Sequence, residues 1–281
     1  MGSNWFGARS TVTRGLQRRN SSVTRQHLMR AARRASIALA ALASCVSAPS
    51  LDETKLIDLS HSVDANAPTP EGVAPFELIK TPAPAGERWW LSSRLDSPDR
   101  AGAYFQAPLT FAEGRRALDE FEPARWIGPV RVIDVARAAD RDRTYLATVE
   151  DLRLHERRNG RIQPGAAVLV RTGWDGRWST RERYFGLGQD QRANHPGLEP
   201  TLARELAARR VELVGIDAPD VDGGLGVERA ASRVLAAADI AVLGNLAGLA
   251  ALPARGATLI AAPLKLRGGA TAPARVFAIL P

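Results

Sequence analysis

Short runs of apolar residues recur along residues 51–281 with the spacing typical of β-strands. The clearest is 130–135, Val-Arg-Val-Ile-Asp-Val, in which apolar and polar side chains alternate and therefore predict a strand with one buried face. Similar runs predict further strands at 56–60, 89–95, 166–171, 211–216, 240–243, 258–264 and 274–280. Five prolines between Pro68 and Pro84 predict an extended, irregular segment after the first strand.

Helical patterns separate the strands in the C-terminal half. Thr148 is a capping residue at the start of one predicted helix, and Asn-Gly at 159–160 ends it. Two further helices are predicted over 199–210 and 227–238. Strands that alternate with helices predict parallel βαβ units, whereas the strand-rich N-terminal half predicts antiparallel pairing. We therefore expect one α/β domain over 51–281, with a mixed sheet flanked by helices.

The net charge of +8 would suit a nucleic-acid-binding protein, but the distribution of charge does not. Residues 1–50 contain eight Arg and no acidic residue, so the other 231 residues contain thirty basic and thirty acidic side chains. The predicted domain is therefore neutral overall, and we expect no nucleic-acid partner. The basic character belongs to a leader, residues 1–50.

The leader has the order of a secretory signal. A basic stretch at 29–36 precedes an apolar run at 37–43, and small residues then lead to Cys45, the only cysteine. The apolar run is far shorter than the roughly 20 residues that span a bilayer. Leu42-Ala-Ser-Cys45 resembles a bacterial lipobox, which implies export, lipidation of Cys45 and a membrane-anchored protein in the periplasm or outer cell envelope. An ordinary cleaved signal with a free cysteine is the alternative.

Five segments of the chain, in order, resemble the cyclase family, which includes bacterial kynurenine formamidase and isatin hydrolase. Each motif alone is weak, and their shared order carries the resemblance. The segments are Leu56-Ile-Asp-Leu-Ser-His61; 102–111 with 127–130 and 132–135; Val168-Leu-Val-Arg-Thr-Gly-Trp174; Val214-Gly-Ile-Asp-Ala-Pro-Asp-Val-Asp222; and 245–253 with 259–267 and 273–275.

This resemblance implies a swivelling β/β/α cyclase-like fold over 51–281 and a homo-oligomer. Active members of the family hydrolyse amide bonds, such as that of N-formylkynurenine, with a zinc or manganese ion held by His and carboxylate ligands. The ion lowers the pKa of its bound water from about 15.7 to about 7 and polarises the substrate carbonyl.

The family's metal ligands are replaced in this chain, according to the resemblance. The motif His-x-Gly-Thr-His-x-Asp-x-Pro-x-His falls on 100–110, and a further His and Glu fall near the last helix and strand. The residues at the ligand positions are Arg100, Tyr104, Thr110 and Ser232 for His, Gln106 for Asp, and Gly244 for Glu. Because a guanidinium stays protonated, Arg100 would repel a cation. We therefore expect no family metal and no metal cofactor.

The remaining polar residues offer no obvious replacement site. The histidines beyond the leader are expected to be structural (His61), solvated (His155) and part of a loop (His195). We expect Asp217 and Arg275 to serve structure, with a new metal or acid–base role for the carboxylates at 217, 220 and 222 as the alternative. The tryptophans expected in the core or in subunit contacts are Trp89, Trp90, Trp174 and Trp178.

Three functional hypotheses follow. The first is a cell-envelope member of the family that lacks metal and amide hydrolysis and binds a small anionic ligand through Arg100, with Tyr104, Gln106, Thr110 and Ser232 either donating hydrogen bonds to it or merely filling the vacated cavity. The second is an active hydrolase of formamides or cyclic amides with a non-standard site. The third is a scaffold that acts through oligomerisation or partner binding.

Overall fold

The computed structural model describes residues 52–281, except 71, 72 and 227. The leader and the predicted lipidation site Cys45 lie outside the described residues. Within the described part of the chain, no helix is long and apolar enough to cross a membrane.

The central sheet is mixed and closes on itself. β4 hydrogen-bonds to both β10 and β12, so seven strands form a ring, and β1 adds to the outer side of β12. The neighbours β5, β7, β9 and β10 run parallel, and the other pairings are antiparallel. The strands of this sheet are β1 (Leu56–Asp58), β4 (Tyr104–Gln106), β5 (Ile127–Asp134), β7 (Ala167–Arg171), β9 (Leu213–Ile216), β10 (Ala241–Gly244), β11 (Arg255–Pro263) and β12 (Thr271–Ile279). The predicted mixed sheet is confirmed.

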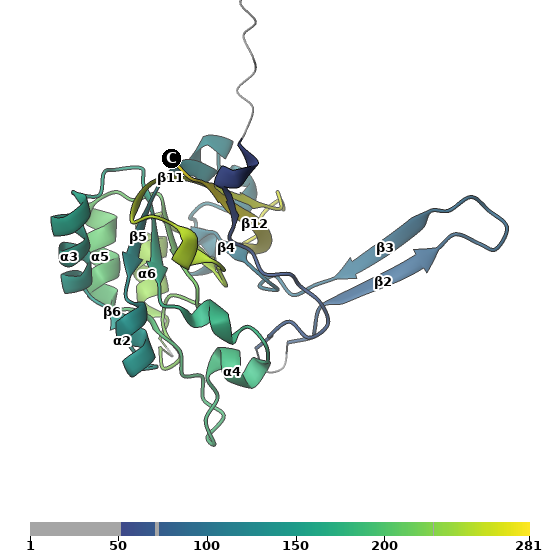
Figure 1. Ribbon diagram of the computed structural model, residues 1–281, viewed down its shortest axis with the longest axis horizontal. Coiled ribbons are helices and arrows are strands. Elements are labelled where there is room, and N and C mark those ends of the chain that lie inside the picture. Colours follow the sequence, from purple (N-terminus) through teal and green to yellow (C-terminus); the bar gives the residue numbers. More distant parts are fainter. Residues whose placement is uncertain (1–51, 71–72, 227) are drawn as a thin grey trace, which may run out of the picture. The chain divides into compact units, whose positions relative to one another are not determined.

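Helices flank the parallel strands, as predicted. Figure 1 shows α3 and α5 side by side, and both lie over the same side of the sheet. Thr148 caps α3 through a reciprocal hydrogen-bond pair with Asp151, and Gly160 ends the helix with a positive φ. The helices are α2 (Ala136–Arg141), α3 (Val149–Asn159), α4 (Arg181–Phe185), α5 (Pro200–Ala208) and α6 (Ala230–Ala237). Short 3₁₀ helices lie at Glu53–Lys55, Pro108–Thr110, Leu118–Glu120, Pro123–Trp126, Trp174–Arg177 and Leu249–Ala251, and β6 (Leu146–Ala147) pairs with β8 (Gly197–Leu198).

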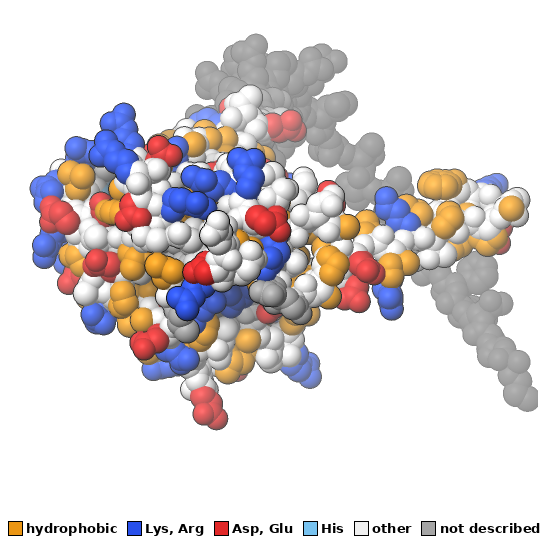
Figure 2. Space-filling view, turned by 90° about the horizontal axis from the view of Figure 1, so that it is seen from below, with side chains coloured by type: hydrophobic (Ala, Val, Ile, Leu, Met, Phe, Trp, Pro, Cys, Tyr) orange, Lys and Arg blue, Asp and Glu red, His pale blue; other side chains and the backbone are white. Residues whose placement is uncertain are grey.

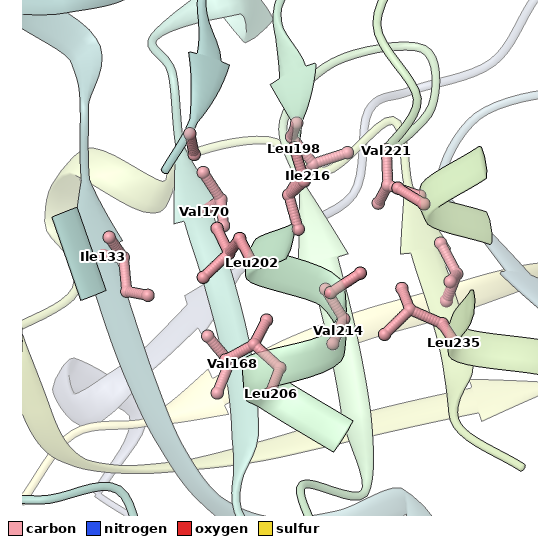
Figure 3. Close-up of a cluster of buried hydrophobic side chains, with 14 of the residues drawn as sticks. Ile133, Val168, Val170, Leu198, Leu202, Leu206, Val214, Ile216, Val221 and Leu235 are labelled. Carbon is pink, nitrogen blue, oxygen red and sulfur yellow. The ribbon is translucent and has the colours of Figure 1, made fainter. Parts of the chain in front are cut away.

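Two buried clusters result from the alternation of side chains along the strands. Val168 and Val170 of β7 face the helices and pack with Leu202 and Leu206 of α5, as Figure 3 shows. Leu169, between them, belongs to the second cluster with Leu259 and other residues of the ring. Both faces of the parallel strands are therefore buried, which explains their nearly continuous apolar sequence.

The segment after β1 corrects one expectation. Instead of remaining irregular, it forms the strand β2 (Glu77–Pro82), which pairs antiparallel with β3 (Leu91–Asp96) in a hairpin. β3 itself confirms the strand predicted over 89–95. The prolines do not prevent this because Pro82 is the last residue of β2, where a missing N–H costs little. Trp89 and Trp90 near its tip are exposed, so neither belongs to the core of this chain, whereas Trp174 is fully buried.

Two further expectations are wrong. His155 is buried instead of solvated, because it lies on the inner side of α3, next to β5. Arg275 is largely exposed, and its ion pair with Asp58 lies at the surface (2.6 Å), where such pairs contribute little to stability.

Candidate functional site

Tyr104 and Gly244 form the centre of the region in which the family ligands were expected. They are directly paired residues of β4 and β10, and the Tyr104 ring lies over the Gly244 backbone. A Cβ atom at position 244 would lie only 2.3 Å from Cζ of that ring. The Tyr104 hydroxyl donates to the Pro219 carbonyl (2.9 Å), and burial raises the pKa of the phenol far above its ordinary value. The tyrosine is therefore neutral, fixed, and fills the space beside the glycine.

Arg100 is held in place by two of the neighbouring replacements. Its Nη2 donates to Oε1 of Gln106 (2.7 Å), and its guanidinium carbon lies 5.1 Å from the centroid of the Tyr104 ring, within cation–π distance. Within the described part of the chain, no carboxylate lies within ion-pair distance of Arg100. A positive charge is thus positioned without being neutralised.

The other two side chains of the set bond elsewhere in the protein. Thr110 Oγ1 donates to the Ala270 carbonyl (2.9 Å). Ser232, at the start of α6, hydrogen-bonds to Asp222 through both its backbone N–H (3.0 Å) and its hydroxyl. Burial raises the pKa of that carboxyl, and the bonds from Ser232 oppose the shift. The hydroxyl groups of Thr110 and Ser232 are therefore already hydrogen-bonded within the protein.

These residues do not fit the metal that the family uses. A guanidinium stands at one of the predicted ligand positions, the Tyr104 ring blocks a side chain at Gly244, and the remaining hydroxyls and amide are engaged with protein partners. Among the residues described here, no group of three or more His, Cys, Asp and Glu side chains could hold an ion.

A cavity of about 370 Å³ opens beside Arg100. Among the six positions, Arg100 alone lines it. An ion pair between Arg229 and Asp220 forms part of its wall. Burial opposes ionisation of the Asp220 carboxyl, and the Arg229 guanidinium is among the groups that nonetheless lower its pKa. Its apolar lining includes Pro68, Phe185, Leu187 and Pro219. This volume and mixed lining are typical of small-molecule sites.

His195 also lines the cavity, and sequence reasoning missed it. The residue lies in a loop, as expected, but its side chain is buried. Nδ1 lies 3.1 Å from the Pro196 carbonyl, which assigns the proton to Nδ1 and leaves Nε2 as an acceptor. Burial lowers the pKa of the imidazole, so it is neutral at pH 7. Its position before Pro196-Gly indicated a loop and gave no signal of a cavity.

Asp217 holds the loop after β7 in place, in agreement with the structural role expected for this residue. It is fully buried, and its carboxylate accepts hydrogen bonds from the backbone N–H and hydroxyl of Thr172 (2.8 and 2.6 Å) and from the Gly173 N–H (2.8 Å). Burial nevertheless raises the pKa of Asp217 to about 6. Three hydrogen bonds tie the carboxylate to this loop, and Asp217 does not line the cavity.

The sequence and this fold identify the family of the chain. Residues 57–223 match the family model described as "Putative cyclase", and the chain belongs to that family. It is 32% identical over 193 residues to isatin hydrolase of Roseibium aggregatum, covering 65% of this chain and 72% of that protein.

Solved structures agree with this assignment. An isatin hydrolase bound to the product analogue thioisatinate has a TM-score of 0.75 at 26% identity, covering 81% of this chain and 92% of that one. Isatin hydrolase A from Labrenzia aggregata, bound to benzyl benzoate, has a TM-score of 0.71 at 29% identity, covering 80% and 93%. The predicted family and cyclase-like fold are confirmed. The assignment of individual ligand positions to Arg100, Tyr104, Gln106, Thr110, Ser232 and Gly244 stays a prediction.

Proposed function

We propose that this cyclase-family protein binds a small organic anion beside Arg100 and lacks the metal-dependent amide hydrolysis of its active relatives. One observation carries the proposal: the Arg100 guanidinium is fixed by Gln106 and Tyr104 at the edge of a cavity. A guanidinium held in this way can donate two parallel, charge-assisted hydrogen bonds to a carboxylate.

The charges around the cavity support this choice of ligand. Asp220 is paired with Arg229, and His195 is neutral, so the charge of Arg100 is not compensated by either. The apolar wall, which includes Phe185 and Pro219, suits the flat hydrocarbon part of an aromatic or short-chain acid. The related isatin hydrolase was solved with thioisatinate, itself an organic anion.

The loss of hydrolysis follows from the same residues. Without a Lewis acid, bound water would keep a pKa near 15.7 and the amide carbonyl would not be polarised. Arg100 repels a cation, and Tyr104 excludes a carboxylate from position 244. A metal site needs three or four ligands together, so no single substitution would restore it.

Calorimetric titration of the purified full chain with isatinate, and with its neutral parent isatin, tests the proposal. We expect isatinate to bind and Arg100→Gln to weaken its binding by at least roughly 10- to 100-fold, because each lost hydrogen bond to a charged group contributes about 1.5–3 kcal/mol. Arg158→Gln, at an exposed arginine outside the cavity, is the matched control and should bind as the wild type does. Equal affinity of the wild type and Arg100→Gln would refute anion binding at this site.

An active hydrolase is the second candidate, supported by the 32% identity to isatin hydrolase. The two are separated by metal analysis and by assays with isatin and N-formylkynurenine, with and without added zinc or manganese. We expect far less than one ion per chain and no turnover. One tightly bound ion per chain, with turnover abolished by chelation, would establish the hydrolase instead.

We also propose that the protein is exported and anchored through Cys45. The support is the ordered leader and its lipobox-like Leu42-Ala-Ser-Cys45. Cys45→Ala should release soluble protein or leave an unprocessed precursor in cell fractionation. Processed, membrane-bound Cys45→Ala protein would show that a lipid on this cysteine is not the anchor.

A further inference from the structure

One nitrogen of the His195 imidazole has no hydrogen-bond partner. The residue is only 2% exposed and lines the cavity beside Arg100. Its Nδ1 lies 3.1 Å from the Pro196 carbonyl, which can only accept, so Nδ1 carries the proton and Nε2 carries a lone pair. Among the described residues, no donor reaches Nε2. Because buried polar atoms are normally hydrogen-bonded, this acceptor lacks a partner that a ligand can supply.

Nε2 of His195 reaches the cavity, unlike the corresponding atoms of two other histidines. Nε2 of His61 and Nε2 of His155 are enclosed and unpartnered, so a ligand cannot contact them without opening the fold. Nε2 of His195 is also unpartnered but is not enclosed, and the small surface that this residue keeps lies on the cavity wall. Its lone pair is therefore available to a molecule inside the cavity.

The other buried side-chain acceptors of the cavity wall are occupied. Oδ1 of Asp220 accepts a backbone N–H (2.9 Å), and its Oδ2 pairs with Arg229. Oδ1 of Asn245 accepts from the Tyr184 hydroxyl (2.9 Å). Among the buried residues that the structure describes along this wall, His195 thus supplies the side-chain acceptor that is left unused.

The loop that carries His195 is held in place by a second loop. The Gly224 N–H donates to the His195 carbonyl (2.9 Å), and a Cβ atom at position 224 would lie only 2.4 Å from the Asn194 nitrogen. The two loops therefore approach more closely than any side chain at position 224 would allow. Because the imidazole is also tied to Pro196, Nε2 is fixed before a ligand arrives, which reduces the entropy lost on binding.

We infer that His195 selects ligands that carry a hydroxyl or N–H donor in addition to a carboxylate. The inference rests on the proposed function, in which Arg100 holds the carboxylate, and adds a second point of recognition on the same cavity. Figure 2 shows basic and acidic side chains mixed over the face in view, without a broad positive surface. Selection among organic acids therefore has to come from the residues of the cavity itself.

Matched ligands test the donor without altering the protein. Calorimetric titration of the purified full chain compares meta- and para-hydroxybenzoate with the methyl and methoxy analogues, which have no donor. We expect at least one hydroxy acid to bind roughly 3- to 10-fold more tightly than its methyl analogue, and the methoxy acid, which can only accept, to show no gain. Equal binding of hydroxy and methyl acids would overturn the inference and leave the Arg100 site standing, whereas failure of every acid to bind would overturn both.

Two histidine variants assign the preference to one side chain. His195→Phe removes the acceptor and should reduce the preference for the hydroxy acid to within about twofold, with the methyl acid bound nearly as in the wild type. His155→Phe, at a buried histidine outside the cavity, is the matched control and should keep the full preference. A preference that survives His195→Phe in a folded protein, as judged by circular dichroism, would overturn the inference.

Nitrogen NMR of the imidazoles observes the contact in the wild type and so does not depend on the folding of a variant. The chain has only four histidines, so their ring nitrogens can be resolved. We expect His195 of the free protein to show an unprotonated Nε2, whose resonance shifts when the hydroxy acid binds and not when the methyl acid binds. A protonated Nε2 in the free protein, or equal shifts with the two acids, would overturn the inference.

Discussion

The contact between Tyr104 and Gly244 makes a strong prediction about stability. Gly244→Ala would place a Cβ atom 2.3 Å from Cζ and 2.4 Å from both Cε1 and Oη of the Tyr104 ring. Unstrained contacts of this kind are about 3.5–4.0 Å, so the ring has to move by more than about 1 Å. That displacement breaks the buried hydrogen bond to the Pro219 carbonyl.

The magnitude follows from the separate contributions. Overpacking costs about 1–3 kcal/mol, and an unpaired buried polar group costs about 1–3 kcal/mol. Replacing glycine by alanine within a strand stabilises the folded state by about 0.5–1 kcal/mol, which offsets part of this cost. We therefore expect Gly244→Ala to lower the free energy of unfolding by about 2–4 kcal/mol, which for a domain of this size lowers the melting temperature by roughly 5–15 °C.

Urea unfolding followed by circular dichroism measures the effect, and a double-mutant cycle isolates its cause. Gly176→Ala is the control, because a Cβ there meets nothing within 4 Å, and it should change stability by less than about 0.5 kcal/mol. In a Tyr104→Ala background the ring is absent, so Gly244→Ala should become neutral or stabilising, a coupling of at least about 2 kcal/mol. Equal costs in the two backgrounds would refute the reasoning.

Three further predictions concern the buried carboxylate of Asp217 and the half-buried carboxylate of Glu156. Asp217→Ala removes the acceptor of two backbone N–H groups and one hydroxyl and should cost about 2–4 kcal/mol in thermal unfolding, whereas Asp58→Ala, at the exposed pair, should cost less than about 1 kcal/mol. The folded-state pKa of Asp217 is raised from 3.8 to about 6. Its contribution to the free energy of unfolding is therefore fully present below pH 4 and declines by about 3 kcal/mol as pH rises through 6. The free energy of unfolding of Asp217→Asn, measured across this range, should lack that decline, and a profile identical to that of the wild type would contradict the prediction. Arg209 lowers the pKa of Glu156 by a two-pronged pair (2.9 Å for each bond), so Glu156→Gln should destabilise the protein by about 1–2 kcal/mol at pH 7. That difference should shrink as pH falls through the lowered pKa, and a difference independent of pH would show that the charge is not involved.

Local signals predicted the regular elements well. Thr148 and Gly160 mark the ends of α3 because capping chemistry is local, and the apolar run at β7 is continuous because both its faces are buried. The closure of the ring could not be predicted. β4 is three residues long, and Gln106 pairs with Val242 and Thr271, partners that no local pattern specifies.

The candidate site was predictable only in part. Sequence reasoning selected Arg100, but its attachment to Gln106 and the fit of Tyr104 over Gly244 are contacts in space. His195 was overlooked because a histidine before proline and glycine looks like any loop residue. Of the hairpin, β3 is predictable from the apolar residues around Leu91, whereas the prolines on either side of Glu77 obscure β2.

The double pairing of β4 has a consequence for the order of folding. A strand from the first half of the chain must hydrogen-bond to β10 and β12, which both lie in the C-terminal third, so the ring cannot close until most of the chain is available. Non-local pairing of this kind slows folding and delays native structure until late in synthesis. For the export that we propose, such a delay would keep the nascent polypeptide unfolded long enough to pass through a membrane channel before the sheet closes.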